Sequence, residues 1–357
     1  MQNKSTINHK IEQTLIIALD TVKAKQEIQQ ILENHPIGGV LLYKKNYTTY
    51  LDMIEFINFI KQTNKNAGNP PIFISVDQEG GRVNRIPTDF KNLPSAYALA
   101  QTQDEEIIRE AANITARILE NAGVNMNFAP VLDIKRFANN HAIGDRAYSE
   151  NKEIVAKYAN IYMQEMKEQN ILPVIKHFPG HGLTKKDTHF RLPTINAKIE
   201  EIEKEDMMPF KKLIENGADA MLVSHIIIKE FNKMHPASIS KDVIKYIKDE
   251  LQFKGLIVTD DMRMKAMSMT YGKNIAVKKA VLAGNDMVVL KYSEKERVYE
   301  KLEKLVKNKK IEESEIDKRV EKILEMKEKY QVKDEIKENV IDIEKENLAI
   351  ERIRERC

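Results

Sequence analysis

The sequence has almost no cysteine, no tryptophan and no excess of charge of either sign. Its single cysteine, Cys357, excludes a disulfide within the chain and any zinc site built from several cysteines. The 57 lysines and arginines nearly balance the 54 aspartates and glutamates, whereas a nucleic-acid-binding protein usually carries a basic excess. No apolar run approaches the roughly 18 residues of a membrane span. We therefore expect a cytoplasmic protein, with neither nucleic acid nor membrane as a partner.

Short apolar runs alternate along the chain with longer amphipathic segments. Most of the runs are continuous rather than alternating in hydrophobicity, which is typical of strands buried on both faces of a parallel sheet. We predict eight strands, at Leu15–Asp20, Gly39–Tyr43, Ile72–Asp77, Val124–Asp133, Leu172–His177, Ala220–His225, Leu256–Asp260 and Met287–Leu290. The clearest helical segments between them are Leu51–Asn64, Asp104–Asn121, Lys152–Gln169, Ile199–Asn216 and Ser240–Leu251. This alternation predicts an α/β fold, a single-domain (β/α)8 TIM barrel, with a doubly wound open sheet as the alternative.

The composition changes near residue 292. Beyond it, basic and acidic residues are interleaved, and apolar residues such as Leu302, Ile316 and Ile323 recur at helical spacing. We predict a barrel over residues 1–292, charged amphipathic helices packed on it over 293–333, and a helical tail or linker stub over 334–357.

Polar residues end several of the apolar runs, and in a barrel the active site lies at the carboxyl ends of the strands. These residues are Asp77, Asp133, Lys176, His177, His225 and Asp260. The densest cluster continues to His181 and to Asp187-Thr188-His189. His177 and His181 are four residues apart, but Pro179 and Gly180 between them prevent the helix that would bring both to one metal ion, so a metal site is disfavoured. Taken singly, each histidine is also compatible with a loop-capping role.

Asp187 and His189 are two residues apart, so in an extended chain their side chains point the same way. The carboxylate can then fix the tautomer of the imidazole and favour its charged form, as a general acid/base requires. An attacking partner is offered by Asp260 and Asp261, which end an apolar strand and alternate in direction. The structural alternative is that one of these aspartates only caps the next helix.

The segment Val76–Val83 places two acids, Arg82 and a glycine pair at another strand end. The glycines allow the chain to turn tightly over a ligand. No Lys-Ser/Thr pair follows them, so this is a poor phosphate-binding loop.

Four blocks of the sequence, Val76–Arg85, Ile143–Tyr148, Lys176–His189 and Thr259–Ala266, together resemble the family 3 glycoside hydrolases. They are most similar to the β-N-acetylglucosaminidase branch that acts in peptidoglycan recycling. The most specific signature is Lys-His-Phe-Pro-Gly-His-Gly followed by Asp-Thr-His. The similarity runs from about Leu15 to Leu290 and so covers the predicted barrel.

The resemblance implies a retaining exo-β-N-acetylglucosaminidase that acts on short β-linked saccharides such as peptidoglycan fragments, without a metal or cofactor. Asp260 matches the family's nucleophile, His189 its general acid/base, and Asp187 the residue that orients and charges that histidine. The positions that match those holding the hydroxyls of the terminal sugar are Asp77, Arg146, Lys176 and His177. Supporting positions within the matched blocks are Arg82, His181 and Met264.

Other activities stay open at this point. They are a β-glucosidase or β-xylosidase, an N-acetylglucosaminide phosphorylase, and a non-catalytic sugar-binding barrel. The presence of Asp260, Asp187 and His189 together argues against the last, because a binding protein needs no nucleophile. Leu183 stands where many relatives have Asp. Asn347–Ile350 resembles the helix that leads into a second domain in two-domain relatives, so we expect the stub of such a linker near Cys357; the oligomeric state is open.

Overall fold

The computed structural model describes residues 7–357 except 138–139, 141, 185–191 and 292–294. Its main feature is a sheet of eight parallel strands in the order β10-β1-β2-β3-β4-β5-β7-β9. A further parallel bridge between Val258 and Met287 joins the two ends of this sheet. The sheet is therefore a nearly closed barrel, which confirms the predicted (β/α)8 class over the open sheet. The strands are β1 (Leu15–Ala18), β2 (Gly39–Leu41), β3 (Phe73–Val76), β4 (Met126–Asn127), β5 (Leu172–Phe178), β7 (Ala220–Val223), β9 (Leu256–Thr259) and β10 (Val288–Lys291).

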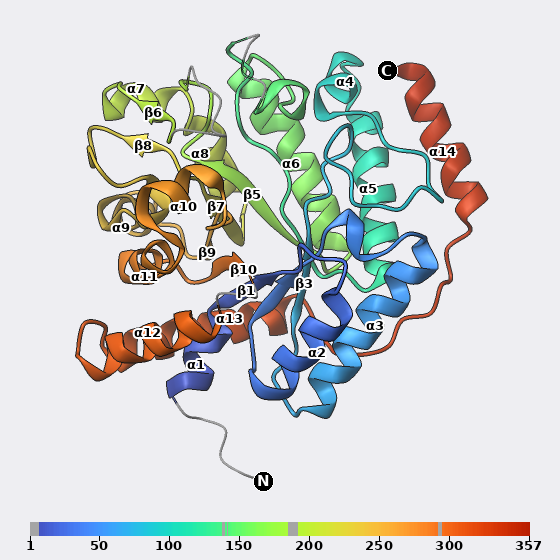
Figure 1. Cartoon of the computed structure of the whole chain (residues 1–357). Helices are drawn as coiled ribbons and strands as arrows, with labels where there is room; N and C mark the ends of the chain where they lie inside the picture. Colours follow the sequence, from blue (N-terminus) through green and yellow to red (C-terminus); the bar gives the residue numbers. More distant parts are fainter. Residues whose placement is uncertain (1–6, 138–139, 141, 185–191, 292–294) are drawn as a thin grey trace.

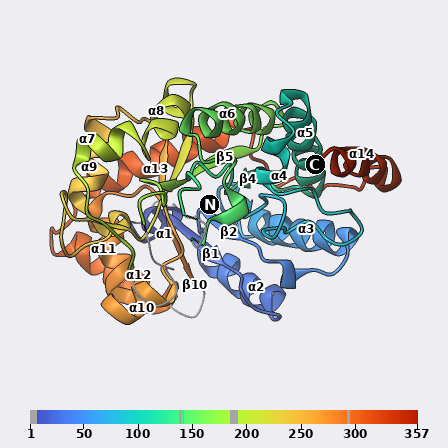
Figure 2. The ribbon, with the colours of Figure 1, turned by 90° about the horizontal axis from the view of Figure 1, so that it is seen from above.

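Helices surround the barrel (Figure 2). Side-chain caps begin several of them; Thr49, for example, accepts a hydrogen bond from the backbone of Asp52. Gly123 ends α5 in the left-handed region, at φ 90°, as glycine does at many helix ends. The helices up to residue 291 are α1 (Ile7–Gln13), α2 (Ala24–Asn34), α3 (Tyr50–Asn66), α4 (Ala96–Gln101), α5 (Glu105–Ala122), α6 (Lys152–Glu168), α7 (Ile199–Lys204), α8 (Met208–Glu215), α9 (Lys241–Asp249), α10 (Lys265–Tyr271) and α11 (Lys273–Ala283). Short 3₁₀ turns are η1 (Lys44–Asn46), η2 (Gly144–Arg146) and η3 (Ala237–Ile239).

Three local predictions are corrected by the structure. The helix predicted over 199–216 is two helices, α7 and α8, because Pro209 suits only the first turn of a new helix. The run 124–133 forms only the short strand β4, followed by irregular chain that pairs again with β5 through a single bridge at Val131. A second sheet, β6 (Thr194–Ile195) with β8 (Ile227–Ile228), was not predicted.

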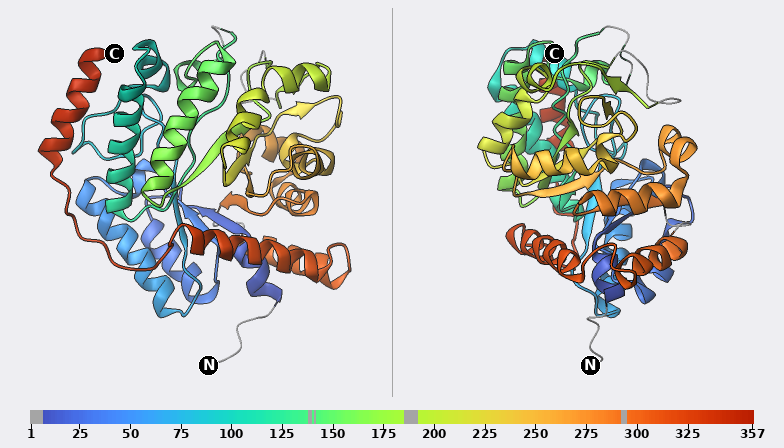
Figure 3. Two further views of the ribbon diagram at one scale, coloured as in Figure 1. Left: turned by 180° about the vertical axis from the view of Figure 1, so that it is seen from behind. Right: turned by 90° about the vertical axis from the view of Figure 1, so that its left-hand side faces the viewer.

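The charged C-terminal helices contact the barrel in two places. α12 (Lys295–Lys307) and α13 (Glu313–Lys329) both contact α1, which lies just below them in Figure 1. Ile323 and Met326 of α13, with Tyr330 beyond it, share one apolar cluster with barrel-interior residues such as Phe73. Chain without helix or strand then leads from 331 to 342, along the outside of the molecule, to α14 (Ile343–Arg356) beside α5 (Figure 3). The domain boundaries at 292 and 333 stay predictions.

Within the described residues, no helix has both the length and the apolar composition needed to cross a membrane.

Candidate active site

A cavity of about 290 Å³ opens at the carboxyl ends of the barrel strands. Of the residues predicted for the site, it brings together Asp77, Arg146, Lys176, His177, His181, Asp260 and Met264. Its remaining lining residues are Glu79, Val83, Arg85, Ala142, Ile143 and Leu222. Asp187 and His189, the predicted acid/base pair, lie outside the described residues, so their placement stays a prediction.

Arg82 does not line the cavity. Its Nε donates to Asp145 at 2.9 Å, and its Nη2 donates to the backbone oxygens of Ala142 and Ile143. Arg82 therefore ties the loop after β3 to the segment that leads into Arg146.

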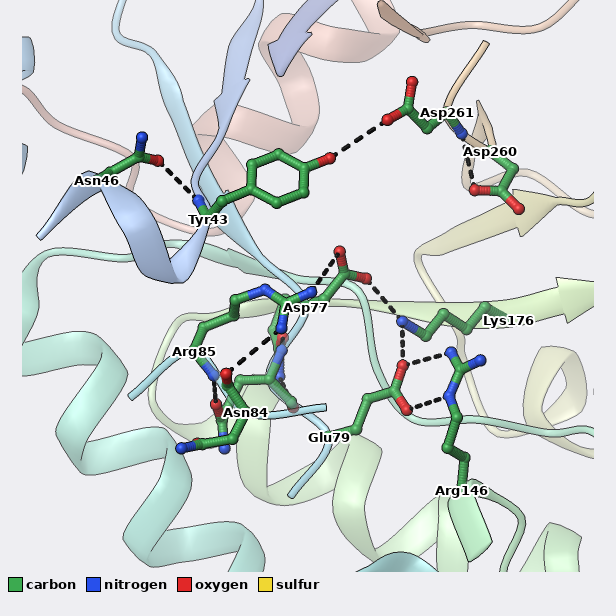
Figure 4. Close-up of polar contacts among 12 residues, drawn as sticks. Tyr43, Asn46, Asp77, Glu79, Asn84, Arg85, Arg146, Lys176, Asp260 and Asp261 are labelled. Carbon is green, nitrogen blue, oxygen red and sulfur yellow. Dashed lines mark hydrogen bonds and ion pairs between the residues drawn. The ribbon is translucent and has the colours of Figure 1, made fainter. Parts of the chain in front are cut away.

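Glu79 was given no role from the sequence, yet it forms ion pairs with two cations of the cavity, Lys176 and Arg146. Arg146 donates to Glu79 through Nε and Nη2, both at 2.7 Å (Figure 4). The Oε1 of Glu79 also lies 2.5 Å from Lys176 Nζ. Lys176 also donates to Asp77 at 2.8 Å. Burial alone would raise the pKa of Glu79, but Lys176 and Arg146 hold that pKa well below its usual range. The sequence signal was the spacing of Asp77 and Glu79, which places both acids on one side of an extended strand end.

Asp133 orients both histidines of the cavity. It is fully buried, lies 2.6 Å from His177 Nδ1, and accepts the backbone N–H of His181 at 2.7 Å. Arg146 Nη2 approaches His177 Nε2 at 3.2 Å. Because Arg146 can only donate, Nε2 must be the acceptor and Nδ1 carries the proton toward Asp133. These contacts fix the orientation of the His177 ring between Asp133 and Arg146. Burial would raise the pKa of Asp133, but His177 and His181 lower it below its ordinary value.

Asp260 and Asp261 face different surroundings. Asp260 lines the cavity, and its Oδ1 accepts the backbone N–H of Asp261 at 2.7 Å. Burial would raise the pKa of Asp260, but His225, His177 and the Asp261 backbone lower it, which favours a carboxylate. Asp261 instead pairs with Arg263, whose Nε lies 2.7 Å from Asp261 Oδ2. Figure 4 shows the two side chains pointing apart.

Arg85 is a second lining residue to which sequence reasoning gave no role. Its Nη2 is 4.0 Å from Asp77 Oδ2, and its Nε is buried without a hydrogen-bond partner in the described part of the chain. A buried donor without a partner is costly. Arg85 therefore adds a cation to the cavity wall beside Asp77.

The same residues give little support for a metal centre. Among the described residues, no group of three or more His, Cys, Asp or Glu side chains is arranged to hold a metal ion. The cations of Lys176 and Arg146 already occupy Asp77 and Glu79. What the cavity offers instead is a set of hydrogen-bond donors and acceptors around one carboxylate, Asp260.

A (β/α)8 barrel with such a cavity at its strand ends has the architecture of a barrel enzyme for a small polar substrate. The family model of the glycosyl hydrolase family 3 N terminal domain matches residues 6–326. The chain belongs to this family, as the sequence motifs predicted.

Relatives within the family agree with this assignment. The chain is 34% identical over 264 residues to a beta-hexosaminidase of Nitrosospira multiformis, covering 72% of this chain and 74% of the relative. It is 32% identical over 279 residues to a beta-hexosaminidase of Tolumonas auensis, covering 77% and 81%. Among solved structures, a family 3 beta-N-acetylglucosaminidase from Paenibacillus sp. matches with a TM-score of 0.92 and 29% identity, over 98% of this chain and 68% of that one.

Proposed function

We propose that this chain is a retaining, exo-acting β-N-acetylglucosaminidase that removes the terminal sugar from short β-linked saccharides. The observation that carries the proposal is the cavity, in which the Asp260 carboxylate faces the donors and acceptors of Asp77, Arg146 and Lys176. The relatives are named beta-hexosaminidase and beta-N-acetylglucosaminidase, which supports N-acetylglucosamine as the terminal sugar. Peptidoglycan fragments are the substrates that the resemblance favours. A cytoplasmic location belongs to the same proposal.

The charged residues suit the hydroxyl groups of one sugar unit. Asp77 offers acceptor oxygens, while Lys176 and Arg146 offer donors whose positions are fixed by Glu79. The bidentate pair between Arg146 and Glu79, together with the burial of Lys176, holds these donor groups in one geometry before a sugar binds. This reduces the entropy lost on binding. A cavity of only about 290 Å³ favours removal of one terminal unit over cleavage within a long polymer.

The proposed reaction uses two groups, Asp260 as the nucleophile and His189 as the general acid/base. Asp260 attacks the anomeric carbon while His189 gives its proton to the leaving oxygen, so the glycosidic bond breaks and a glycosyl ester of Asp260 forms. His189, now neutral, then takes a proton from water; the resulting hydroxide attacks the anomeric carbon and frees Asp260. Two inversions at one carbon retain its configuration. The role of Asp187 and His189 rests on the sequence resemblance.

The neighbouring histidines are poor alternatives as proton donors. Both ring nitrogens of His177 already have partners, Nδ1 with Asp133 and Nε2 with Arg146. Burial lowers the pKa of His181 to about 4. Burial therefore makes His181 a poor proton donor at neutral pH, and the acid/base role of His189 rests on the sequence resemblance.

The test compares p-nitrophenyl β-N-acetylglucosaminide with the matching glucoside and xyloside. We expect kcat/KM at least about tenfold higher for the N-acetyl substrate, from contacts to the acetamido group worth about 1.4 kcal/mol. A preference for the glucoside or xyloside would contradict the sugar assignment. Release of sugar 1-phosphate in phosphate buffer would reveal a phosphorylase. Activity should be unchanged by a chelator.

The nucleophile is tested by a matched pair, Asp260→Asn and Asp261→Asn. Removing the nucleophile should lower kcat by a factor of about 10³ or more, whereas Asp261→Asn keeps the attacking carboxylate and should cost far less. A slow fluorinated glycoside should label Asp260, as located by mass spectrometry of the digested protein. Label on Asp261 would overturn the assignment.

A further inference from the structure

Asp206 is a buried carboxyl outside the sugar-binding set. It lies in the connection between α7 and α8, and its side chain is 0% exposed. Its Oδ2 is 3.5 Å from Arg136 Nη2, a long contact, and its Oδ1 has no hydrogen-bond partner within the described residues. Burial of a carboxyl with so few partners is costly, so its packing contacts must account for its position.

Those contacts are with the turn that follows β5. A Cβ on Gly182 would lie 2.1 Å from Asp206 Oδ1, and a Cβ on Gly180 would lie 2.9 Å from Asp206 Cβ. The backbone amide of Leu183 lies close enough to act on the same carboxyl. The turn from Gly180 to Leu183 therefore rests on Asp206.

The same turn places His181 in the active-site cavity. Its ring lines that cavity together with Asp260, at right angles to the ring of His177 with centroids 5.5 Å apart. Its backbone is fixed on the other side by Asp133. Asp133 and Asp206 thus hold the turn from two directions.

We propose that Asp206 is a positioning residue for the reaction: it supports the Gly180–Leu183 turn and so holds His181 beside Asp260. This inference rests on the proposed function for its catalytic consequence. Asp206 itself does not line the cavity, so it acts on the reaction through the turn.

The surroundings of Asp206 also make this support sensitive to pH. Burial raises the pKa of Asp206 to about 7; Arg136 opposes the shift, and Asp133 and Glu205 add to it. Arg136 also pairs with Glu205, to which its Nη2 donates at 2.9 Å. The Nε of Arg136 is buried without a hydrogen-bond partner in the described part of the chain. Loss of the proton strengthens the attraction between Asp206 and Arg136, whose Nε also lies beside Gly182, and so changes the contact of the carboxyl with the turn.

A double-mutant cycle with Gly182→Ala and Asp206→Ala tests the contact. The backbone of Gly182 lies outside the left-handed region, so the added Cβ meets no backbone strain. It is opposed mainly by Asp206 and less closely by Arg136 Nε, at 3.0 Å. We expect Gly182→Ala alone to lower kcat by about 10- to 100-fold with KM nearly unchanged, because a displacement of about 1 Å has effects of that size. In the double variant at least about tenfold of this loss should return. If the kcat losses of the two single variants instead multiplied in the double variant, as for independent sites, the inference would be overturned.

The pH dependence supplies a second readout. Asp206→Asn keeps the shape of the side chain and removes its titration, so the kcat–pH profile should lose an inflection near pH 7. Glu205→Gln is the matched control, since Glu205 pairs with Arg136 and Lys152 but contacts neither glycine. An Asp206→Asn profile identical to wild type, or the same change in Glu205→Gln, would refute the positioning role.

Imidazole NMR separates this inference from the proposed function. The low pKa of His181 is caused first by burial, so Asp206→Ala should move the measured pKa of that ring toward its ordinary value of about 6.5. The signal is assigned by its absence in His181→Asn. An unmoved ring overturns the inference even in an active enzyme, whereas a wild-type protein that cleaves none of the glycosides overturns only the proposed function.

Discussion

At the scale of single residues, the charges of the cavity nearly cancel before any sugar enters. Asp77 and Glu79 face Lys176 and Arg146 at 2.5 to 2.8 Å. Glu79 has a side chain only 4% exposed, and Lys176 only 2%. Removal of one charge from such a set leaves its partners buried without compensation, which costs far more than the loss of an exposed pair.

We therefore predict that Glu79→Gln raises KM about tenfold or more and lowers the melting temperature. Glutamine keeps the size of the side chain but cannot offer two anionic oxygens to Arg146 and a charge to Lys176. Steady-state kinetics and thermal unfolding measure both effects. The control is Asp145→Asn, which breaks the exposed pair with Arg82, 46% exposed on both sides; a KM shift as large in the control would contradict this account.

Sequence reasoning found the residues that stand at strand ends, because apolar runs mark where strands stop. It did not find the roles of Glu79 and Asp133. These roles depend on how the chain after β3 and β4 meets the polar atoms of β5 and η2. Glu79 and Arg146 are 67 positions apart in the chain. No periodicity carries that pairing. The two adjacent aspartates were easier, since alternation along an extended chain already predicts that Asp260 and Asp261 point apart.

At the scale of elements, α13 has a role that its charged sequence conceals. Its apolar side joins the interior cluster of the barrel, and the ammonium of Lys327 is buried with it, 5.3 Å from the Phe73 ring centroid. Lys327 Nζ donates to Gln13 Oε1 at 2.9 Å. A buried ammonium with one neutral partner is destabilising relative to an apolar side chain of similar size.

Lys327→Met should therefore alter the dependence of stability on pH. Burial lowers the pKa of Lys327 to about 7, whereas the unfolded chain has a lysine pKa of about 10.4. Between these values the unfolded chain binds a proton that the folded chain does not, so wild-type stability gains with pH from about 7 upward. We predict that Lys327→Met removes this gain between pH 7 and 9 and is at least as stable as wild type at pH 7.

Thermal unfolding across that range measures the effect. Lys318→Met is the control on the same helix, because Lys318 is 71% exposed. A wild-type melting curve that responds to pH in the same way as Lys327→Met would contradict the burial of a titrating lysine.

The elements that were predicted well are those with enough residues to show a pattern. The eight barrel strands are visible in the sequence as apolar runs. Most are shorter in the structure than predicted, but β5 extends one residue further, to Phe178, and β10 is shifted by one residue, to Val288–Lys291. β6 and β8 have two residues each, too few for any periodicity. The break between α7 and α8 has a visible cause in Pro209, but its amphipathic surroundings outweighed that signal.

At the scale of the whole molecule, the chain after α13 wraps around the barrel. Asp334 accepts from Asn64 at 2.6 Å and from the backbone of Ile72 at 3.2 Å, which fixes the connecting segment near the start of β3. α14 then packs on the outer side of α5, where Glu346 pairs with Arg117 at 2.7 Å. Ala349, Ile350 and Ile353 are buried in this contact. None of these residues lines the active-site cavity.

Removal of residues 343–357 should therefore lower stability and leave the chemistry intact. Loss of three buried apolar side chains removes several kcal/mol of burial, at about 1.5–3 kcal/mol each for the larger ones, so the melting temperature should fall by several degrees. At 25 °C, kcat/KM should stay within about twofold, since a change below about 0.4 kcal/mol in the barrier is expected from so distant a contact.

The control is Glu346→Ala, which breaks only the pair with Arg117. It should show a smaller fall in melting temperature and the same kcat/KM. A large loss of kcat/KM in the shortened chain, with the barrel still folded by circular dichroism, would show that α14 acts on the cavity as well as on stability.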